Sequence, residues 1–408
     1  MPRKSTKRKT VQRVVQKSFV DTFAEDMDNH EPDMIYGMYG SVRHSLGVTK
    51  VFYSGLPTLD RCLAIKRDTN IYGTPLNKII ELFGTEQSGK TTMALYLCVQ
   101  IIKQGGLAYF VDFEHKFDPA WLRVIAKQNG ISEEMLKRRF RYVDPQHMEG
   151  FIKWLLQFMK KVIAAKKGAR DDLKKLEGKK NKAADHDEQI KRLNEILSIP
   201  FVVVVDSIAS IYTKAEKEGE EESEARVAEL ANLFNRVLKH IRFYLGYTDT
   251  LLLFLNQVRD NIQTNQYLAR FASKIKTPGG NAVKHFSDGR IQISRIGSLK
   301  RTRNKIAYVI GALFKFKIVK NQMGVPPFME TTIKLLHDRG FFSHLSVLDR
   351  LVERKAVMRN GNIYSFSLNG VDHSVHESDA DEFFDENPAI AAKLHKAYCR
   401  LMEGRVAK

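Results

Sequence analysis

Short apolar runs begin to alternate with longer helical stretches at about residue 77 of the chain. The runs occupy residues 79–83, 107–113, 201–206 and 250–257. Apolar runs that alternate with helical stretches in this way are typical of a mostly parallel β-sheet with helices on both faces. The pattern therefore predicts an α/β core.

Three further strand-like runs follow with fewer helical stretches between them. They cover residues 290–296, 314–319 and 329–336. Strands that follow one another without a crossover helix usually pair in antiparallel fashion. We therefore expect a mixed sheet that continues with antiparallel strands, and a core domain that spans residues 51–337.

The N-terminal segment differs from the core in charge. Residues 1–17 contain seven basic and no acidic side chains. Apolar residues then recur at roughly helical spacing, at Val11, Val14, Val15, Val20 and Phe23. We predict that residues 1–50 form a basic tip and a helix used for oligomerisation; binding to nucleic acid and packing against its own domain are the alternatives.

Residues 160–195 are rich in lysine, with 12 basic and 7 acidic side chains and a break at Gly178. The pattern predicts a projecting helical hairpin, either as a solvated surface or as an arm that contacts DNA. After the core, the segment DRLVERKAV at 349–357, a short strand at 362–368 and a helix at 388–402 predict a small α/β domain over residues 338–408.

Composition agrees with a folded protein that meets a polyanion. The chain has 408 residues, 43% of them hydrophobic and 28% charged, with a net charge of +19. Its cysteines, Cys62, Cys98 and Cys399, have the spacing of neither a disulfide framework nor a zinc site. No apolar run predicts a membrane span or a signal peptide, so we expect a cytoplasmic protein without a membrane partner.

The strongest chemical signal is the sequence GTEQSGKTT at residues 84–92, which follows a predicted strand and precedes a predicted helix. It matches the phosphate-binding pattern G-x-x-x-x-G-K-[ST]. The glycines let backbone N–H groups wrap phosphates, the lysine places a charge on the β- and γ-phosphates, and the next hydroxyl binds Mg²⁺. The motif predicts ATP and Mg²⁺ binding by Gly84, Thr85, Glu86, Gln87, Ser88, Gly89, Lys90, Thr91 and Thr92.

Two carboxylates follow neighbouring strands. Asp206 ends the buried run 201–206, where it is expected to hold Mg²⁺ through water, unless it caps the next helix instead. Glu114 comes just after the strand at 107–113, a position that suits a base for a water molecule attacking the γ-phosphate. Asp112 and Asp118 compete for this role.

The run at 250–257 ends in Asn256 and Gln257, and about twenty residues with little periodicity follow it. Gln257 is placed to sense the γ-phosphate. The segment mixes cations with aromatic residues, a combination suited to phosphate contacts and base stacking. We therefore expect it to bind single-stranded DNA through Arg259, Arg270, Lys274 and Lys276, interleaved with Tyr267 and Phe271.

These segments together resemble the RecA recombinases of bacteria and their phages, in the same order and over nearly the whole chain. The similar segments are IIELFGTEQSGKTT, YFVDFEHKFDPAW, VVVVDSIASIYTKAEKEGE, LLLFLNQVRDNI, TPGGNAVKHFSDGRIQISRIGSLK and FKIVKN, with FFDENPAIAAKLHKAYCRLM in the C-terminal domain. The resemblance implies a RecA-like P-loop ATPase core with a mixed, mostly parallel sheet, an N-terminal helix and a small C-terminal α/β domain.

The resemblance also implies roles for individual residues of the nucleotide site. Lys90 and Thr91 become the phosphate and magnesium residues, Glu114 the catalytic carboxylate, and Gln257 the switch between the γ-phosphate and the DNA loop. Asp118 and Trp121 are expected to contact adenine. In this family ATP lies between the protomers of a helical filament and two lysines of the neighbour complete the site. Lys320 matches one lysine, whereas Gln322 stands at the other, so we expect slower hydrolysis.

For DNA, the resemblance implies two sites. Arg259, Ile262, Gly279 and Gly280 match the loop that holds single-stranded DNA, with Ile262 between base triplets. The other loop reads EGEEESEAR at 218–226 and is acidic, so only its backbone or Arg226 suits phosphate. The weaker site, which captures duplex DNA, corresponds to Lys315 and Lys317 on one face of a strand, joined by Arg295.

We therefore predict a DNA-dependent ATPase that forms a filament on single-stranded DNA, pairs it with double-stranded DNA and promotes strand exchange. A single-strand-binding protein or a loader is a further expected partner. The long 160–195 hairpin, the basic N-terminal tip and the absence of an acidic tail favour a phage-type, specialised member. The alternatives are a ring-forming helicase with the same core and a non-catalytic DNA-coating protein regulated by ATP, which Gln322 supports.

Overall fold

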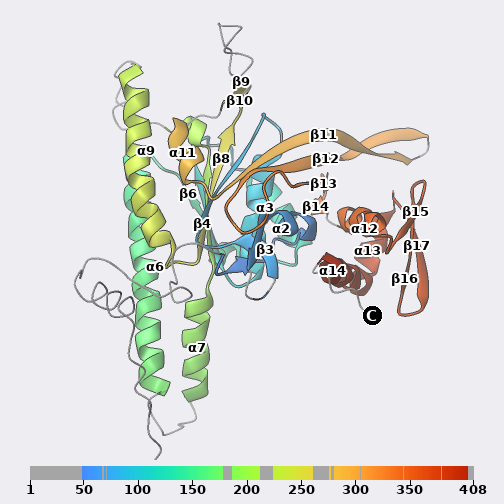
Figure 1. Cartoon of the computed structure of the whole chain (residues 1–408), viewed down its shortest axis with the longest axis horizontal. Helices are drawn as coiled ribbons and strands as arrows, with labels where there is room; N and C mark the ends of the chain where they lie inside the picture. The colour runs from blue at the N-terminus through green and yellow to red at the C-terminus, as the bar shows by residue number, and fades with distance from the viewer. Residues whose placement is uncertain are drawn as a thin grey trace, which may run out of the picture. The chain divides into compact units, whose positions relative to one another are not determined.

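The computed structural model of the chain describes residues 48–66, 69, 71–177, 186–211, 224–260, 275–276, 280–303, 305–342, 344–377 and 379–402 (Figure 1). These residues belong to one unit, Gly47–Lys408. The basic tip and the N-terminal helix predicted from the sequence lie outside the described residues, apart from the last few positions before residue 51.

A mixed sheet organises the described residues, in which it has nine strands. Six of them pair in parallel, from β11 to β6, and the three from β12 to β14 extend the sheet in antiparallel fashion. The predicted α/β class with a mostly parallel sheet is confirmed. The strand order is β14 (Gly340–Phe342), β13 (Glu330–Leu336), β12 (Ile306–Asn321), β11 (Gly289–Arg303), β4 (Lys78–Gly84), β8 (Thr250–Gln257), β7 (Phe201–Asp206), β5 (Leu107–Asp112) and β6 (Phe140–Val143).

The central strands are buried on both faces. In β7, Val202 and Val204 belong to one hydrophobic cluster, and Val203 and Val205 belong to another on the opposite face. Successive side chains of a strand point to opposite faces, so a strand covered on both faces must be apolar throughout. This requirement explains why the central strands read as unbroken apolar runs.

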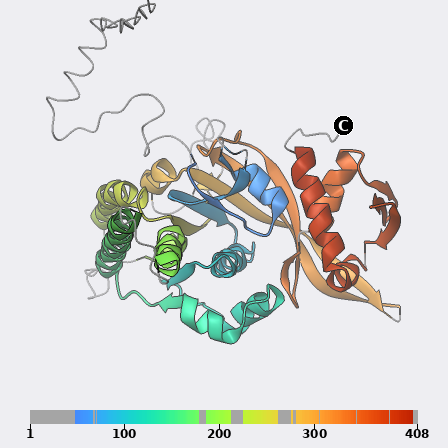
Figure 2. The same ribbon diagram turned by 90° about the horizontal axis from the view of Figure 1, so that it is seen from below.

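Helices α2 (Pro57–Leu63), α3 (Lys90–Lys103), α4 (Pro119–Gln128) and α5 (Glu133–Arg139) contribute to the first cluster. Helices α6 (Met148–Glu177), α9 (Glu224–Leu245) and α11 (Gly280–Phe286) contribute to the second. Figures 1 and 2 show α6 and α9 lying beside each other. The single 3-10 turn among the described residues, η1 (Ile208–Ser210), follows β7.

Several elements were not predicted from the sequence. The edge strand β6 is one, and a small sheet of β1 (Val51–Phe52), β3 (Ile71–Pro75) and β2 (Ala64–Lys66) is another. The expected strands at 290–296 and 314–319 proved to be parts of the longer β11 and β12, which form a hairpin interrupted by register shifts. The strand β14 lies just past residue 337, and the predicted domain boundary there stays a prediction.

The C-terminal residues pack around their own hydrophobic cluster, which includes Leu348, Tyr364 and Leu394. Helices α12 (His344–Glu353), α13 (Ala380–Glu386) and α14 (Pro388–Met402) surround it. A three-stranded sheet of β15 (Met358–Asn360), β16 (Ile363–Leu368) and β17 (Val371–His376) completes the region, where the sequence predicted one strand. Across the described segments, we find no helix with the length and apolar character needed to span a bilayer.

The predicted 160–195 hairpin corresponds to α6 and α7 (His186–Ser198), while its expected break at Gly178 lies outside the described residues. The buried stripe of α6 recurs at helical spacing from Met148 and ends at Ala169. Beyond that point none of the described α6 residues is buried, and α7 has no buried residue. The distal part of this helix pair therefore adds little to the core.

A buried lysine fastens α6 to its surroundings. Lys166 Nζ donates to Asp249 Oδ2 at 2.5 Å and to the carbonyl oxygens of Leu197 and Ile199 at 3.1 Å each. Lys50 also donates to Asp249 Oδ2, at 2.5 Å. A buried charge is tolerated when it is paired and hydrogen-bonded in this way. Lys166 therefore joins α6, the end of α7 and the start of β8.

Replacing this lysine should destabilise the fold. Lys166→Ala removes a buried donor and leaves two carbonyl groups and part of the Asp249 charge unsatisfied, so we expect a loss of about 2–4 kcal/mol in the free energy of unfolding. Urea denaturation followed by circular dichroism measures it. The control is Lys167→Ala, the next and exposed lysine of α6, for which we expect a change within about 0.5 kcal/mol. Equal losses in both variants would contradict the role of Lys166.

Candidate nucleotide and DNA sites

The loop between β4 and α3 has the backbone that a phosphate-binding loop requires. A Cβ on Gly84 would lie 2.3 Å from the carbonyl oxygen of Ile293, so only glycine fits there. Gly89 (φ 84°) and Gln87 (φ 54°) both adopt the left-handed conformation. Left-handed residues at alternate positions turn neighbouring N–H groups toward a common centre, and the first turn of α3 adds its own N–H groups. The predicted anion site therefore has the right backbone.

Lys90, the first residue of α3, is buried and turned back onto this loop. Its Nζ donates to the carbonyl oxygens of Gly84 (3.1 Å) and Thr85 (2.7 Å) and lies 3.4 Å from Ser88 Oγ. Burial lowers the pKa of the Lys90 ammonium, whereas the negative charge of Asp206 raises it. Carbonyl oxygens thus solvate a cation that has the position and charge to meet a phosphate.

Thr91 and Asp206, the two residues predicted to bind Mg²⁺, contact each other. Thr91 Oγ1 donates to Asp206 Oδ2 at 2.8 Å. Burial raises the pKa of Asp206 to about 6, although the hydrogen bond from Thr91 lowers it. The alternative role of Asp206 as a helix cap does not hold, because Ser207 occupies the N-cap position of η1.

A hydroxyl and one carboxylate suit Mg²⁺, which prefers oxygen ligands and keeps several waters. Nowhere in the described part of the chain do three or more His, Cys, Asp or Glu side chains gather as a metal site. Mg²⁺ bound with phosphate oxygens does not need such a cluster, so the residues present fit this ion.

Glu114 collects hydrogen bonds from three strand ends. Its Oε1 accepts from Gln257 Nε2 (3.1 Å), Ser210 Oγ (3.3 Å) and Ser207 Oγ, and its Oε2 accepts from Lys116 Nζ (2.9 Å). Burial raises the pKa of Glu114, but the hydrogen bonds from Ser207, Lys116 and Gln257 outweigh it and lower the pKa below its ordinary value. These donors therefore favour the ionised form of the Glu114 carboxylate.

The two competitors of Glu114 have other structural partners. Asp112 accepts from the backbone N–H groups of Glu114 and Phe117, at 3.0 Å each, and so shapes the loop. Asp118 caps α4 by accepting from the N–H groups of Ala120 and Trp121. Both carboxylates organise backbone, which leaves Glu114 as the acid that faces Gln257.

The residues expected to contact adenine lie close to the phosphate loop. Trp121 Nε1 donates to Thr92 Oγ1 at 3.2 Å, which places the indole beside the first turn of α3. Asp118 begins the same helix as its N-cap. The adenine role of both residues stays a prediction.

A buried polar chain that was not predicted continues from Gln257 into the sheet. The N–H of Gln257 donates to Asn256 Oδ1 (3.0 Å), and Asn256 Nδ2 donates to Glu81 Oε1 (2.9 Å). Arg290 Nε donates to the other oxygen of Glu81, with its guanidinium 4.7 Å from the ring centre of Phe83. Asn256 and Glu81 are fully buried. This series of hydrogen bonds crosses β8, β4 and β11. It links Glu114 and Gln257 to the β11–β12 hairpin.

Lys320 and Gln322 lie at the end of β12 and just after it. Lys320 Nζ donates to the carbonyl oxygens of Lys284 (2.9 Å) and His285 (3.0 Å), near the end of α11. Burial lowers the pKa of Lys320, while Asp288 raises it. Gln322 is exposed. Among the described residues, no hydrogen bond joins Lys320 or Gln322 to Glu114 or Lys90, and the predicted role of both residues at a neighbouring protomer stays a prediction.

The predicted single-stranded DNA segment is described only in part. β9 (Arg259–Asp260) and β10 (Ile275–Lys276) pair in antiparallel fashion, which brings Arg259 opposite Lys276. Gly280 begins α11. The remaining predicted DNA residues of this segment lie outside the described residues: Ile262, Arg270, Lys274 and Gly279, together with Tyr267 and Phe271. The acidic loop also lies outside them up to residue 223.

The residues predicted to capture duplex DNA lie on the β11–β12 hairpin. Lys315 and Lys317 pair with Ser294 and Gln292, so both lysines share one face. Lys317 is exposed, whereas Lys315 forms an ion pair with Glu330 at 2.8 Å. Residues 289–329 contain nine basic and no acidic side chains, which makes the hairpin a strongly positive part of the sequence. Arg295 is exposed, and its guanidinium donates to Ser298 Oγ at 3.1 Å.

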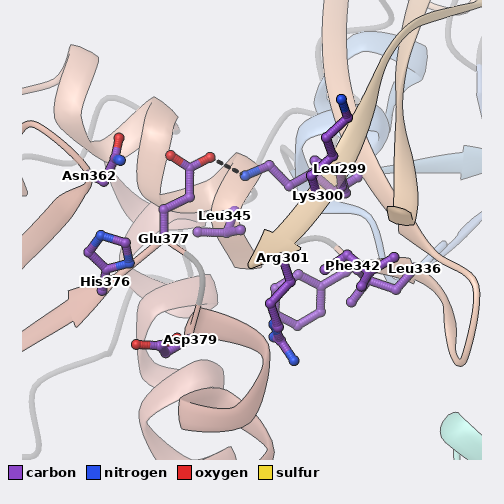
Figure 3. A pocket seen from close by; sticks show the side chains of 12 residues that line it. Leu299, Lys300, Arg301, Leu336, Phe342, Leu345, Asn362, His376, Glu377 and Asp379 are labelled. Carbon is purple, nitrogen blue, oxygen red and sulfur yellow. Dashed lines mark hydrogen bonds and ion pairs between the residues drawn. The ribbon is translucent and has the colours of Figure 1, made fainter. Parts of the chain in front are cut away.

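A cavity of about 570 Å³ lies between this hairpin and the C-terminal elements (Figure 3). Lys300 and Arg301 line it from β11, His376 lines it from the end of β17, and Glu377 lines it from just past that strand. Lys334 of β13 also lines the cavity and forms an ion pair with Glu377. The predicted nucleotide residues are not among those that line this cavity, so it is separate from the phosphate loop.

Comparison with known proteins agrees with this geometry. The family model of the RecA N-terminal domain matches residues 48–137 and 182–342 and passes over residues 138–181. The chain is 30% identical over 330 residues to Protein RecA of Aquifex aeolicus (strain VF5), covering 80% of this chain and 78% of that protein. It is 28% identical over 360 residues to Protein RecA of Aquifex pyrophilus, covering 88% and 86%. The fold, the phosphate loop and these matches agree, and the chain belongs to the RecA family of recombinases.

Proposed function

We propose that this protein is an ATP- and single-stranded-DNA-dependent recombinase that forms a helical filament, pairs its DNA with homologous duplex and promotes strand exchange. The observation that carries the proposal is the position of Glu114. Its carboxylate contacts Gln257, which precedes the DNA segment, on the sheet edge that also holds the phosphate loop and Asp206. The hydrogen bond between Glu114 and Gln257 therefore connects the proposed hydrolytic residue to the start of the proposed DNA-binding segment.

The hydrolytic part of the proposal assigns a task to each residue. The phosphate loop and Lys90 bind and orient the triphosphate, and Glu114 accepts a proton from the attacking water. Thr91 and Asp206 would hold Mg²⁺, which would supply positive charge for the negatively charged triphosphate. Trp121 and Asp118 position the adenine.

The DNA part of the proposal rests on Gln257 and its neighbours. A phosphate that draws Gln257 away from Glu114 also changes the start of the segment that follows β8. The buried chain through Asn256 and Glu81 to Arg290 connects the same residue to the positive hairpin. ATP binding would thereby favour the conformation that grips DNA, and hydrolysis would favour release. Single- and double-stranded DNA and further copies of the chain are the proposed partners.

One alternative retains a specific observation in its favour. Gln322 stands where the family resemblance implies a lysine, which supports a non-catalytic DNA-coating protein. The four donors around Glu114 favour hydrolysis instead. They stabilise an ionised carboxylate, which a hydrolytic reaction uses as a base and which ATP binding alone does not require.

Electron microscopy of the protein with single-stranded DNA and a slowly hydrolysed ATP analogue tests the assembly. A helical filament is expected. Closed rings would indicate a helicase, and a coat that forms equally without nucleotide would contradict the ATP dependence. A strand-displacement assay on a forked duplex tests the helicase alternative independently, because a helicase would release the displaced strand.

Removal of Lys90 should abolish nucleotide chemistry. Lys90→Ala takes away the ammonium that stabilises charge on the transferring phosphoryl group, so DNA-stimulated ATP turnover should fall by about two orders of magnitude or more. The control is Lys103→Ala, an exposed lysine in the last turn of the same helix, which should retain turnover. Unchanged turnover in Lys90→Ala would rule out the assignment of the phosphate loop.

Replacement of Glu114 should separate binding from hydrolysis. Glu114→Gln keeps the shape of the side chain but removes the base, so ATP binding and filaments should persist while turnover falls by about two orders of magnitude or more. Single-turnover phosphate release measures it. Glu133→Gln, on the exposed surface of α5, serves as the control. Turnover within about threefold of the unmodified protein would assign the base to another residue.

The two DNA sites should respond differently to substitution. Arg259→Ala with Ile262→Ala should weaken single-strand binding and DNA-stimulated hydrolysis. Lys315→Ala with Lys317→Ala should leave both intact but prevent homologous pairing, and each lost phosphate contact should reduce the salt slope of duplex capture by roughly one unit. Measurements of DNA affinity, ATP turnover and strand exchange over a salt series compare the pairs. Equal loss of single-strand binding would place the lysines in the primary site.

A further inference from the structure

Lys116 lies in a short loop between β5 and α4 whose backbone is held on both sides of it. Asp112 accepts hydrogen bonds from the N–H groups of Glu114 and Phe117, and His115 between them adopts a left-handed conformation (φ 53°). The ring of Phe117 packs against aromatic neighbours with ring centres 5.2–5.6 Å away, namely Phe110, Phe140 and Tyr142. The loop therefore fixes the direction in which the Lys116 side chain leaves the backbone.

The side chain of Lys116 reaches the proposed base. Its Nζ donates to Glu114 Oε2 at 2.9 Å, while the other donors to Glu114, Gln257 among them, all meet Oε1. The Glu114 side chain is 11% exposed and the Lys116 side chain is 70% exposed. The lysine end of this ion pair is therefore exposed to solvent, whereas its carboxylate is largely buried. Lys116 can exchange its partner because its ammonium is open to solvent and Glu114 keeps its three donors at Oε1.

The charges around Lys116 are those of the phosphate loop. The hydrogen bond and the negative charge of Glu114 raise the pKa of Lys116, and Glu86 and Asp206 act in the same direction. Lys116 in turn lowers the pKa of Lys90. Two lysines thus share one electrostatic neighbourhood with several carboxylates. The carboxylates repel a triphosphate that binds at this loop. Each nearby ammonium group offsets part of that repulsion and stabilises the bound triphosphate.

We propose that Lys116 is a catalytic residue that leaves Glu114 when ATP binds and contacts the terminal phosphate. The exchange does two things at once. It places a second ammonium group from the same chain beside Lys90, and it frees the Glu114 oxygen that Lys116 had occupied to accept a proton from water. This inference rests on the proposed ATPase function and adds a phosphate-contacting residue to it.

The prediction is a selective loss of affinity for the triphosphate. Lys116→Ala should bind a slowly hydrolysed ATP analogue about tenfold or more weakly, the scale of one charge-assisted hydrogen bond, while ADP affinity stays within about twofold. Lys116→Arg should recover most of the loss because it retains the charge. Lys127→Ala, an exposed lysine of α4, is the matched control. Fluorescence titration with labelled nucleotides at fixed Mg²⁺ measures these affinities without turnover.

Two results would overturn the inference. Equal affinities of Lys116→Ala and the unmodified protein for the analogue would show that Lys116 does not contact the terminal phosphate. Tighter binding of the analogue by Lys116→Ala would show that the lysine only restrains Glu114. Failure of the proposed function looks different: the unmodified protein would then bind neither nucleotide, or Lys90→Ala would bind both normally.

Discussion

The central strands β4, β5, β7 and β8 are covered by helices on both faces, and this constraint determines where polar chemistry can be placed. A polar side chain in the middle of such a strand needs a partner within the sheet, as Glu81 has in Asn256 and Arg290. Elsewhere the polar residues collect at the carboxyl ends of the strands. The phosphate loop, Glu114, Asp206 and Gln257 lie together because parallel strands bring these ends to one edge.

Local sequence was sufficient for most of this edge. The apolar runs before Lys90, Glu114, Asp206 and Gln257 predicted the strands correctly. A strand that is buried on both faces consists almost entirely of apolar residues, so its sequence is easy to recognise. The local pattern left Asp112 and Asp118 open beside Glu114 as the base, the family resemblance favoured Glu114, and the role of Glu114 stays a prediction. Their carboxylates differ in which backbone groups they meet, and the sequence has no record of that.

Contacts between distant segments were the ones that the sequence could not predict. Glu81 and Arg290 meet because β11 pairs with β4, although 209 residues separate them. A strand order that departs from chain order cannot be derived from periodicity, which reports only on neighbours along the chain. Short strands were missed for a related reason: β6 has only four residues and none of them is fully buried, so its pattern is weak. The sequence did not single out Lys116, because an exposed lysine in a loop is common and has no pattern that indicates a site.

The family model passes over residues 138–181, the stretch that contains β6 and all of α6. The last buried residue of α6 is Ala169, close to Lys166 and its ion pair with Asp249. Residues added or removed beyond this anchor lengthen or shorten the helix pair without shifting the register of any strand. The outer part of the α6–α7 pair is therefore where the fold accepts insertions and deletions at the smallest cost in stability. Related proteins can differ there in sequence and length without disturbing the central sheet.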